Sequence, residues 1–120
     1  MIEDGRPIFV QIAEQIENDI IDGLLPEEGQ VPSTNEFAAF HRINPATAGK
    51  GVNVLVENGI LYKRRGIGMF VAAGAREQLL GRRRDEFSAE YLRPLIAEAA
   101  KLGISTEQLT DLIRKEEAAS

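Results

Sequence analysis

The candidate functional side chains are positively charged or donate hydrogen bonds, and they are concentrated in the middle of the sequence. Lys50 stands between two glycines in the stretch "TAGKGVN", and Lys63, Arg64 and Arg65 form a consecutive basic run. Lysine and arginine bind phosphate oxygens and the edges of bases. A basic run is often only a solvated surface, and glycines also occur in short, marginally stable helices. From these residues alone, both interpretations stay open.

Enzymatic chemistry is disfavoured by the composition. The chain has no cysteine and a single histidine, His41, which leaves no thiol nucleophile, no disulfide framework and little for metal binding. Glu36 and Glu57 fall on different predicted helices, and "GIGMF" lacks the strand-to-helix setting of a phosphate-binding loop. We expect no enzyme, no metal and no cofactor, with His41 a solvated or helix-end residue.

The net charge of −5 conceals an uneven distribution along the 120 residues. Residues 1–29 hold one basic and eight acidic side chains, residues 30–72 hold five basic and two acidic ones, and residues 73–120 hold eight and nine. Affinity for a polyanion depends on the local patch that neutralises phosphates. The middle segment therefore remains compatible with a nucleic-acid partner.

The composition is that of one ordinary globular domain, or of a small domain with an appended element. No apolar run approaches the ~20 residues needed to cross a bilayer. The acidic start "MIEDGRP" lacks the basic and apolar regions of a signal peptide. We therefore expect a cytoplasmic protein with no membrane partner.

Two helices are predicted before residue 42. Apolar residues at helical spacing between Pro7 and Gly23 indicate the first, and "LLPEEGQVP" after it can hold at most a short strand near Gln30 and Val31. Ser33 to Glu36 is a capping box that opens the second helix. This helix is expected to bury Phe37, Ala38 and Phe40.

A third helix follows after a tight turn, with Asn44 as its N-cap and Pro45 as its first residue. Its spacing directs Ala48, Val52, Leu55 and Val56 into the core and leaves Ala46, Thr47, Gly49, Lys50 and Asn53 facing outward. Gly59 can end it. "LYKRRGIGMFVA" then predicts two strands joined by a glycine-containing turn, so a helix-turn-helix is followed by a basic hairpin.

The rest of the chain is predicted to be helical. Apolar residues from Leu79 to Leu102 mark a long amphipathic element, kinked or interrupted near Pro94 and ended by Gly103, and "STEQ" at Ser105 is a second capping box. The apolar stripes of this tail need either the preceding domain or a second copy of the chain, and we favour the second copy. The predicted fold is mainly α with a small β-hairpin wing, divided into a winged helix-turn-helix domain at 1–73 and a two-helix dimerisation tail at 74–120.

The segment Val31–Val71 resembles the winged helix-turn-helix of GntR-type bacterial transcription regulators. The resemblance rests on an ordered set of motifs: Pro32-Ser33, Asn44-Pro45-x-Thr47, Gly59 and Gly66-x-Gly68-x-Phe70-Val71. With the first helix it covers residues 7–72. The N-P-x-T start and the short helical tail are similar to the YtrA-type subfamily.

This resemblance implies a homodimeric regulator, expected to be a repressor, that binds a pseudo-palindromic DNA operator. The third helix would enter the major groove and the wing the minor groove, with the C-terminal helices joining the two copies. An unidentified small effector would sit at the dimer interface or between tail and winged domain. The residues implied in DNA contact are Ser33, Thr34, Asn35, Asn44, Ala46, Thr47, Gly49, Lys50, Asn53, Lys63, Arg64, Arg65 and Gly66.

Some positions depart from the family pattern. The family commonly has arginine at the position of Asn35, asparagine or arginine at that of Ala46, and bulkier residues than Gly49 and Gly51. Fewer fixed donors favour weaker binding, or binding that depends more on the wing and on DNA shape. A rival interpretation is a protein-interaction module that has lost specific DNA binding and docks a protein through its acidic first helix.

Overall fold

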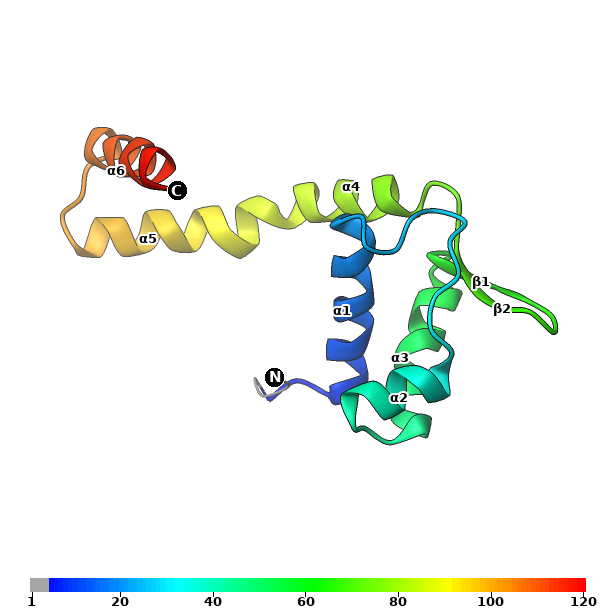
Figure 1. Cartoon of the computed structure of the whole chain (residues 1–120). Coiled ribbons are helices and arrows are strands. Elements are labelled where there is room, and N and C mark those ends of the chain that lie inside the picture. The colour runs from blue at the N-terminus through cyan, green and yellow to red at the C-terminus, as the bar shows by residue number, and fades with distance from the viewer. Residues whose placement is uncertain (1–4) are drawn as a thin grey trace. The chain divides into compact units, whose positions relative to one another are not determined.

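The first three helices lie close to their predicted positions in the computed structural model, which describes residues 5–120. Helix α1 spans Ile8–Ile21, α2 spans Thr34–His41 and α3 spans Pro45–Glu57 (Figure 1). The interpretation of the first residues as unlike a signal peptide depends in part on residues 1–4. These lie outside the described residues. The predicted helix-turn-helix of α2 and α3 is confirmed.

Both predicted N-caps of this motif form. The Glu36 amide donates to Ser33 Oγ at 3.1 Å and the Ser33 amide donates to Glu36 Oε1 at 2.9 Å, which completes the capping box. The Ala46 amide donates to the side-chain oxygen of Asn44 at 2.7 Å. The start of each helix is therefore fixed by a residue that the sequence identifies.

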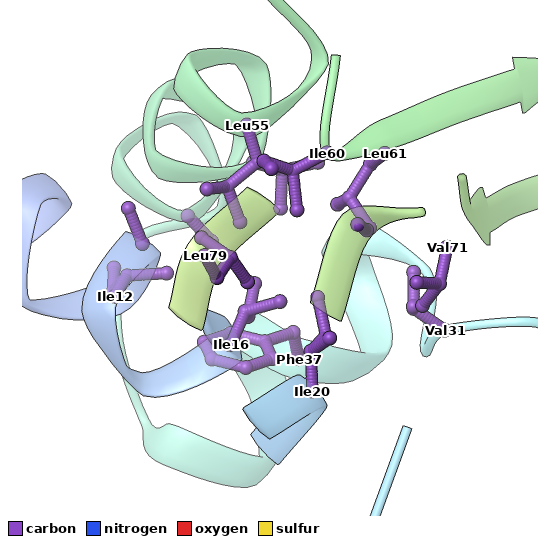
Figure 2. Packing of buried hydrophobic residues seen from close by; sticks show 14 of the residues in the cluster. Ile12, Ile16, Ile20, Val31, Phe37, Leu55, Ile60, Leu61, Val71 and Leu79 are labelled. Carbon is purple, nitrogen blue, oxygen red and sulfur yellow. The ribbon is translucent and has the colours of Figure 1, made fainter. Parts of the chain in front are cut away.

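The core of this part of the chain lies where α1 and α3 pack together. Ile12, Ile16 and Ile20 form the buried face of α1, and the side chains packed around them come from α2, α3, the two strands of the wing and the start of the helix that follows the wing (Figure 2). Among the latter, Leu55 is fully buried and Phe37 nearly so. Packing of α1 against α3 thus holds the helix-turn-helix in place.

One prediction about this core is wrong. Phe40 was expected to be buried, but its side chain is 83% exposed. Phe37 and Ala38 mark the buried face of the short helix α2, and Phe40 lies two residues beyond Ala38, about 200° around the helix axis. The position therefore faces solvent, and the apolar character of Phe40 misled the prediction.

The wing is an antiparallel hairpin of β1, Leu61–Arg64, and β2, Gly68–Val71. In its register Leu61 pairs with Val71 and Arg64 with Gly68. Near Gln30, where the sequence predicts at most a short strand, the structure has an isolated bridge from Gln30 to Phe70, on the free edge of β2. The base of the wing is therefore three segments wide.

Helix α4 spans Ala75–Phe87, and its first turns complete the core of the winged part, where Ala75 and Leu79 are buried. The chain divides into two units, Met1–Gly81 and Arg82–Ser120, and each is described by itself. The functional division at residues 73 and 74 stays a prediction.

Within the second unit, the helix near Pro94 changes its hydrogen bonding without a loop. A π-helical segment, η1, spans Ser88–Leu92 and is followed by α5, Arg93–Lys101. The Arg93 amide donates to the Ser88 carbonyl five residues earlier, and Pro94, which has no amide to donate, lies in the first turn of α5. The predicted kink or interruption thus takes the form of a π segment.

The tail ends in α6, Thr106–Ala119, which opens with the second predicted capping box at Ser105 and Gln108. Only Ala99 is buried among the apolar side chains of this unit. Those that stay exposed are Phe87, Tyr91, Leu92, Leu95, Ile96, Leu102, Leu112 and Ile113.

Candidate nucleic-acid interface

The outward face of α3 is shallow and sparsely covered by side chains. Ala46, Lys50 and Asn53 are exposed there, as predicted, whereas Thr47 and Gly49 are half-buried. A depression of about 420 Å³ runs along this face, lined by Ala46, Gly49, Lys50, Asn53, Val54 and Glu57. The five α3 positions predicted to face outward thus lie on the solvent side of the helix, and four of them line or border one concave surface.

The two glycines beside Lys50 have different neighbours. A Cβ atom added to Gly51 would lie 2.8 Å from the Phe9 carbonyl oxygen and 2.9 Å from Ile12 Cγ2, both on α1. A Cβ at Gly49 would meet only Thr34 Cγ2, at an ordinary 3.6 Å. Gly51 therefore allows the close approach of α1 and α3, and its absent side chain has nothing to do with a partner surface.

Lys50, the one basic residue on α3, is held against the protein. Its Nζ lies 4.2 Å from the centroid of the Phe9 ring, a cation–π contact. An exposed contact of this kind contributes about 0.5–1 kcal/mol. The side chain is thus positioned but remains able to move to another acceptor.

The start of α2 lies next to the outward face of α3, because Thr34 Cγ2 is 3.6 Å from the position that a Cβ atom on Gly49 would take. Ser33 and Asn35 are exposed and Thr34 is half-buried. The Ser33 oxygen accepts a hydrogen bond within the capping box, so its hydroxyl proton remains available for an outside acceptor. The fold therefore brings the α2 candidates beside those of α3.

The basic run forms a second cluster on the wing, which projects beyond the helices of the first unit (Figure 1). Lys63, Arg64, Arg65 and Gly66 are all exposed. The Arg64 guanidinium stacks on the Phe70 ring, 4.8 Å from its centroid. The hairpin thus presents three cations around a turn in which Gly66 has φ +75°.

Two side-chain hydrogen bonds tie the wing to the segment after α1. The Tyr62 hydroxyl donates to Glu28 Oε1 at 2.5 Å, and Gln30 Nε2 donates to the Ile67 carbonyl at 3.1 Å. The hydrogen bond to Glu28 raises the pKa of Tyr62, because it favours the protonated phenol. These contacts fix the orientation of the basic hairpin relative to the helices.

Arg42 is a candidate that the sequence analysis missed. It is exposed in the turn between α2 and α3 and adopts a left-handed conformation with φ 57°. A basic residue inside the predicted three-residue turn was the available signal. Asn44, in contrast, uses its side-chain oxygen to cap α3, so its predicted DNA contact would have to come from the side-chain amide.

Other kinds of site find little support between residues 5 and 120. In that range no three His, Cys, Asp or Glu side chains come together as potential metal ligands. None of the helices described has the length and apolar content to span a membrane. The geometry instead supports contact with an anionic surface, through donors on α2, α3 and the wing.

Comparison with known proteins agrees with this geometry. No family model matches the sequence. The chain is 29% identical to the HTH-type transcriptional repressor YtrA of Bacillus subtilis, over 92% of this chain and 85% of that protein.

Two solved structures are similar in fold. A putative GntR-family transcriptional regulator from Bacteroides thetaiotaomicron shares 31% identity with a TM-score of 0.75, covering 93% of this chain and 97% of that one. The DNA-binding domain of AraR, solved in complex with operator ORX1, shares 31% identity with a TM-score of 0.54, covering 56% of this chain and 81% of that one.

Proposed function

Because the chain belongs to the GntR family of helix-turn-helix transcriptional regulators, we propose that it binds an operator sequence in duplex DNA and regulates transcription there. The observation that carries this proposal is the outward face of α3, where small residues flank Lys50 and Asn53, beside exposed donors on α2. AraR, whose domain is similar to the winged part of this chain, was solved on operator DNA.

In this proposal α3 enters the major groove. Small side chains at Ala46 and Gly49 let the helix approach the base edges closely, and the Ala46 methyl can contact a thymine methyl. Lys50 and Asn53 reach base edges and supply the sequence discrimination. For Lys50 this requires leaving the ring of Phe9, a modest cost against a hydrogen bond to a base.

Phosphate contacts come from the residues around this face. Ser33, Thr34 and Asn35 at the start of α2 donate to one strand, supported by the positive end of the helix dipole. Thr47 and Asn44 do the same at the start of α3. Arg42, in the intervening turn, adds positive charge that partly replaces the arginine missing at Asn35.

The wing supplies the second contact. Lys63, Arg64 and Arg65 neutralise phosphates or enter the flanking minor groove, and Gly66 lets the backbone approach. The hydrogen bonds from Tyr62 and Gln30 hold the hairpin ready for this contact. With few fixed donors on α3, we expect a large share of the affinity to come from this cluster.

We infer that the tail joins two copies of the chain. Eight large apolar side chains stay exposed in the described part of the second unit and its border helix, a larger set than a solvated monomer usually presents. Leu95 and Ile96 on α5 share one helical face with Leu92, the last residue of η1, and Leu102, which directly follows α5. A symmetric dimer would bury these faces and match a pseudo-palindromic operator.

Repression by occupation of a promoter is the simplest mode of action, because it needs no chemistry from the protein. YtrA, a relative along most of the chain, is a repressor. A cytoplasmic location follows from this role.

Selection from a random pool of duplex DNA tests the proposal. We expect enrichment of an inverted repeat, and we expect Lys50→Ala to tolerate more base changes within each half-site. Enrichment of no sequence by the folded wild-type protein would refute the regulator function and leave the protein-interaction module as the alternative.

A further inference from the structure

A groove in the first unit, between the second half of α1, the segment that follows it and α2, has no role in the proposed DNA contact. It encloses about 460 Å³, within the ~300–1,000 Å³ range of small-molecule sites. Ile16, Leu25, Val31 and Phe37 contribute to its apolar wall. Figure 2 shows three of these side chains, Ile16, Val31 and Phe37, among the packed residues of the core.

The aromatic residues of α2 extend this wall into solvent. The Phe37 and His41 ring centroids are 4.3 Å apart, and those of Phe40 and His41 are 5.0 Å apart. Phe40 also lines the groove, although 83% of its surface is exposed. Contact of so large an apolar side chain with water is unfavourable relative to its burial. A ligand bound in the groove would cover this side chain.

The polar lining of the groove is mainly acidic. Asp19 on α1 and Glu36 on α2 both belong to it. The hydrogen bond from the Ser33 amide lowers the pKa of Glu36 and keeps its carboxylate charged. The groove therefore combines aromatic faces with two carboxylates, which attracts cations and repels anions.

We propose that the groove of Asp19, Glu36, Phe37, Phe40 and His41 binds a small organic cation with an apolar body, such as a quaternary ammonium compound. Aromatic faces and nearby carboxylates are the groups that recognise such ions. The site lies within the winged unit, whereas the sequence led us to expect an effector at the dimer interface or between tail and winged domain. It depends on the groove alone, whatever the DNA function.

The sole histidine of the chain makes the test direct, because the ring resonances of His41 cannot be confused with those of another residue. Full-length protein without DNA is titrated with benzyltrimethylammonium chloride at fixed pH, and proton NMR follows the His41 ring. We expect a saturable shift. Benzyl alcohol and phenylacetate, the neutral and anionic probes with the same ring, should bind at least about fivefold more weakly.

Variants assign the binding to the groove. Phe40→Ala and Asp19→Asn remove an exposed ring and one charge without touching the core, and each should weaken binding by about three- to tenfold. Ile8→Ala removes an exposed apolar side chain at the opposite end of α1, outside the groove, and should have no effect.

Several results would overturn the proposal. The first is the absence of a saturable shift with the cation, and the second is an equal response to the neutral probe. A shift of the His41 resonance on dilution without ligand would identify a second copy as the occupant. A lysine- and leucine-containing peptide that shifts the resonance where the small cation does not would identify a protein segment.

Discussion

Gly49 and Gly51 lie on the same helix, two residues apart, and only one of them is needed for packing. An alanine Cβ at Gly51 would be 2.8 Å from a backbone oxygen of α1, a contact that requires the two helices to separate. We expect Gly51→Ala to lower the free energy of unfolding by about 1–3 kcal/mol. Chemical denaturation of the full chain measures this.

Gly49→Ala is the matched control. It adds the same methyl group at a position with space, and alanine is favoured over glycine inside a helix by about 1 kcal/mol. The variant should be as stable as wild type or more so. Equal stability of the two variants would contradict the packing of α1 against α3 described above.

Tyr62 provides a pH-dependent test of the wing anchor. Its hydroxyl donates to Glu28, and its pKa is raised above 10.0, so the stabilisation is present below the unfolded pKa and is lost as pH rises through the folded one. Tyr62→Phe should therefore be less stable than wild type at about pH 8, and the difference should shrink as pH rises above the ordinary tyrosine pKa of about 10. A difference that stays constant as pH rises through this range would exclude the hydrogen bond as its source.

At the scale of elements, the capping box of α2 serves both stability and the proposed phosphate contact, and substitution can separate the two. Ser33→Ala loses the cap and should cost about 1 kcal/mol of unfolding free energy. Ser33→Asp keeps a good cap but places a negative charge beside the proposed phosphate.

We therefore expect Ser33→Asp to unfold like wild type in denaturant while binding DNA more weakly. DNA affinity of Ser33→Asp equal to that of wild type would remove Ser33 from the proposed interface without affecting its role as a cap.

Helix starts and ends were predictable from the sequence where they depend on residues close to each other in the chain. The capping boxes at Ser33 and Ser105, the Asn44-Pro45 start of α3 and the left-handed Gly59 all depend on neighbours within a few residues, and all are confirmed. The π segment η1 was only partly foreseen, because Pro94 signals a defect in the helix without fixing its form.

Features set by contacts between elements were not predictable. The burial of Gly51 depends on how close α1 approaches α3, and the exposure of Phe40 depends on which side of a two-turn helix faces the core. The face of α3 followed from its period, because its apolar positions are unambiguous. The groove beside Phe40 had no signal in the sequence at all.

At the scale of the whole molecule, the proposed dimer depends on the apolar face of α5. Ile96→Glu places a charge on this face and should weaken self-association by roughly 10- to 100-fold. Ala97→Glu adds the same charge to an exposed position on the opposite side of the helix and should leave it unchanged. Sedimentation velocity over a range of protein concentrations distinguishes them.

A wild-type protein that sediments as a monomer at every concentration would contradict the dimer. Dimerisation that resists Ile96→Glu would instead move the interface away from this face of α5.

The central claim is that α3 and the wing bind DNA, and the salt dependence of binding tests it most directly. Fluorescence anisotropy with the selected duplex would compare wild type with Arg64→Ala/Arg65→Ala, and with Arg114→Ala/Lys115→Ala on α6 as a control of equal charge change. Between about 50 and 200 mM salt the affinity of wild type should fall by orders of magnitude. The slope of log affinity against log salt concentration should correspond to about two fewer phosphate contacts in the wing variant, and it should be unchanged in the control. Binding that lacks a salt dependence, or that weakens equally in both double variants, would contradict the account.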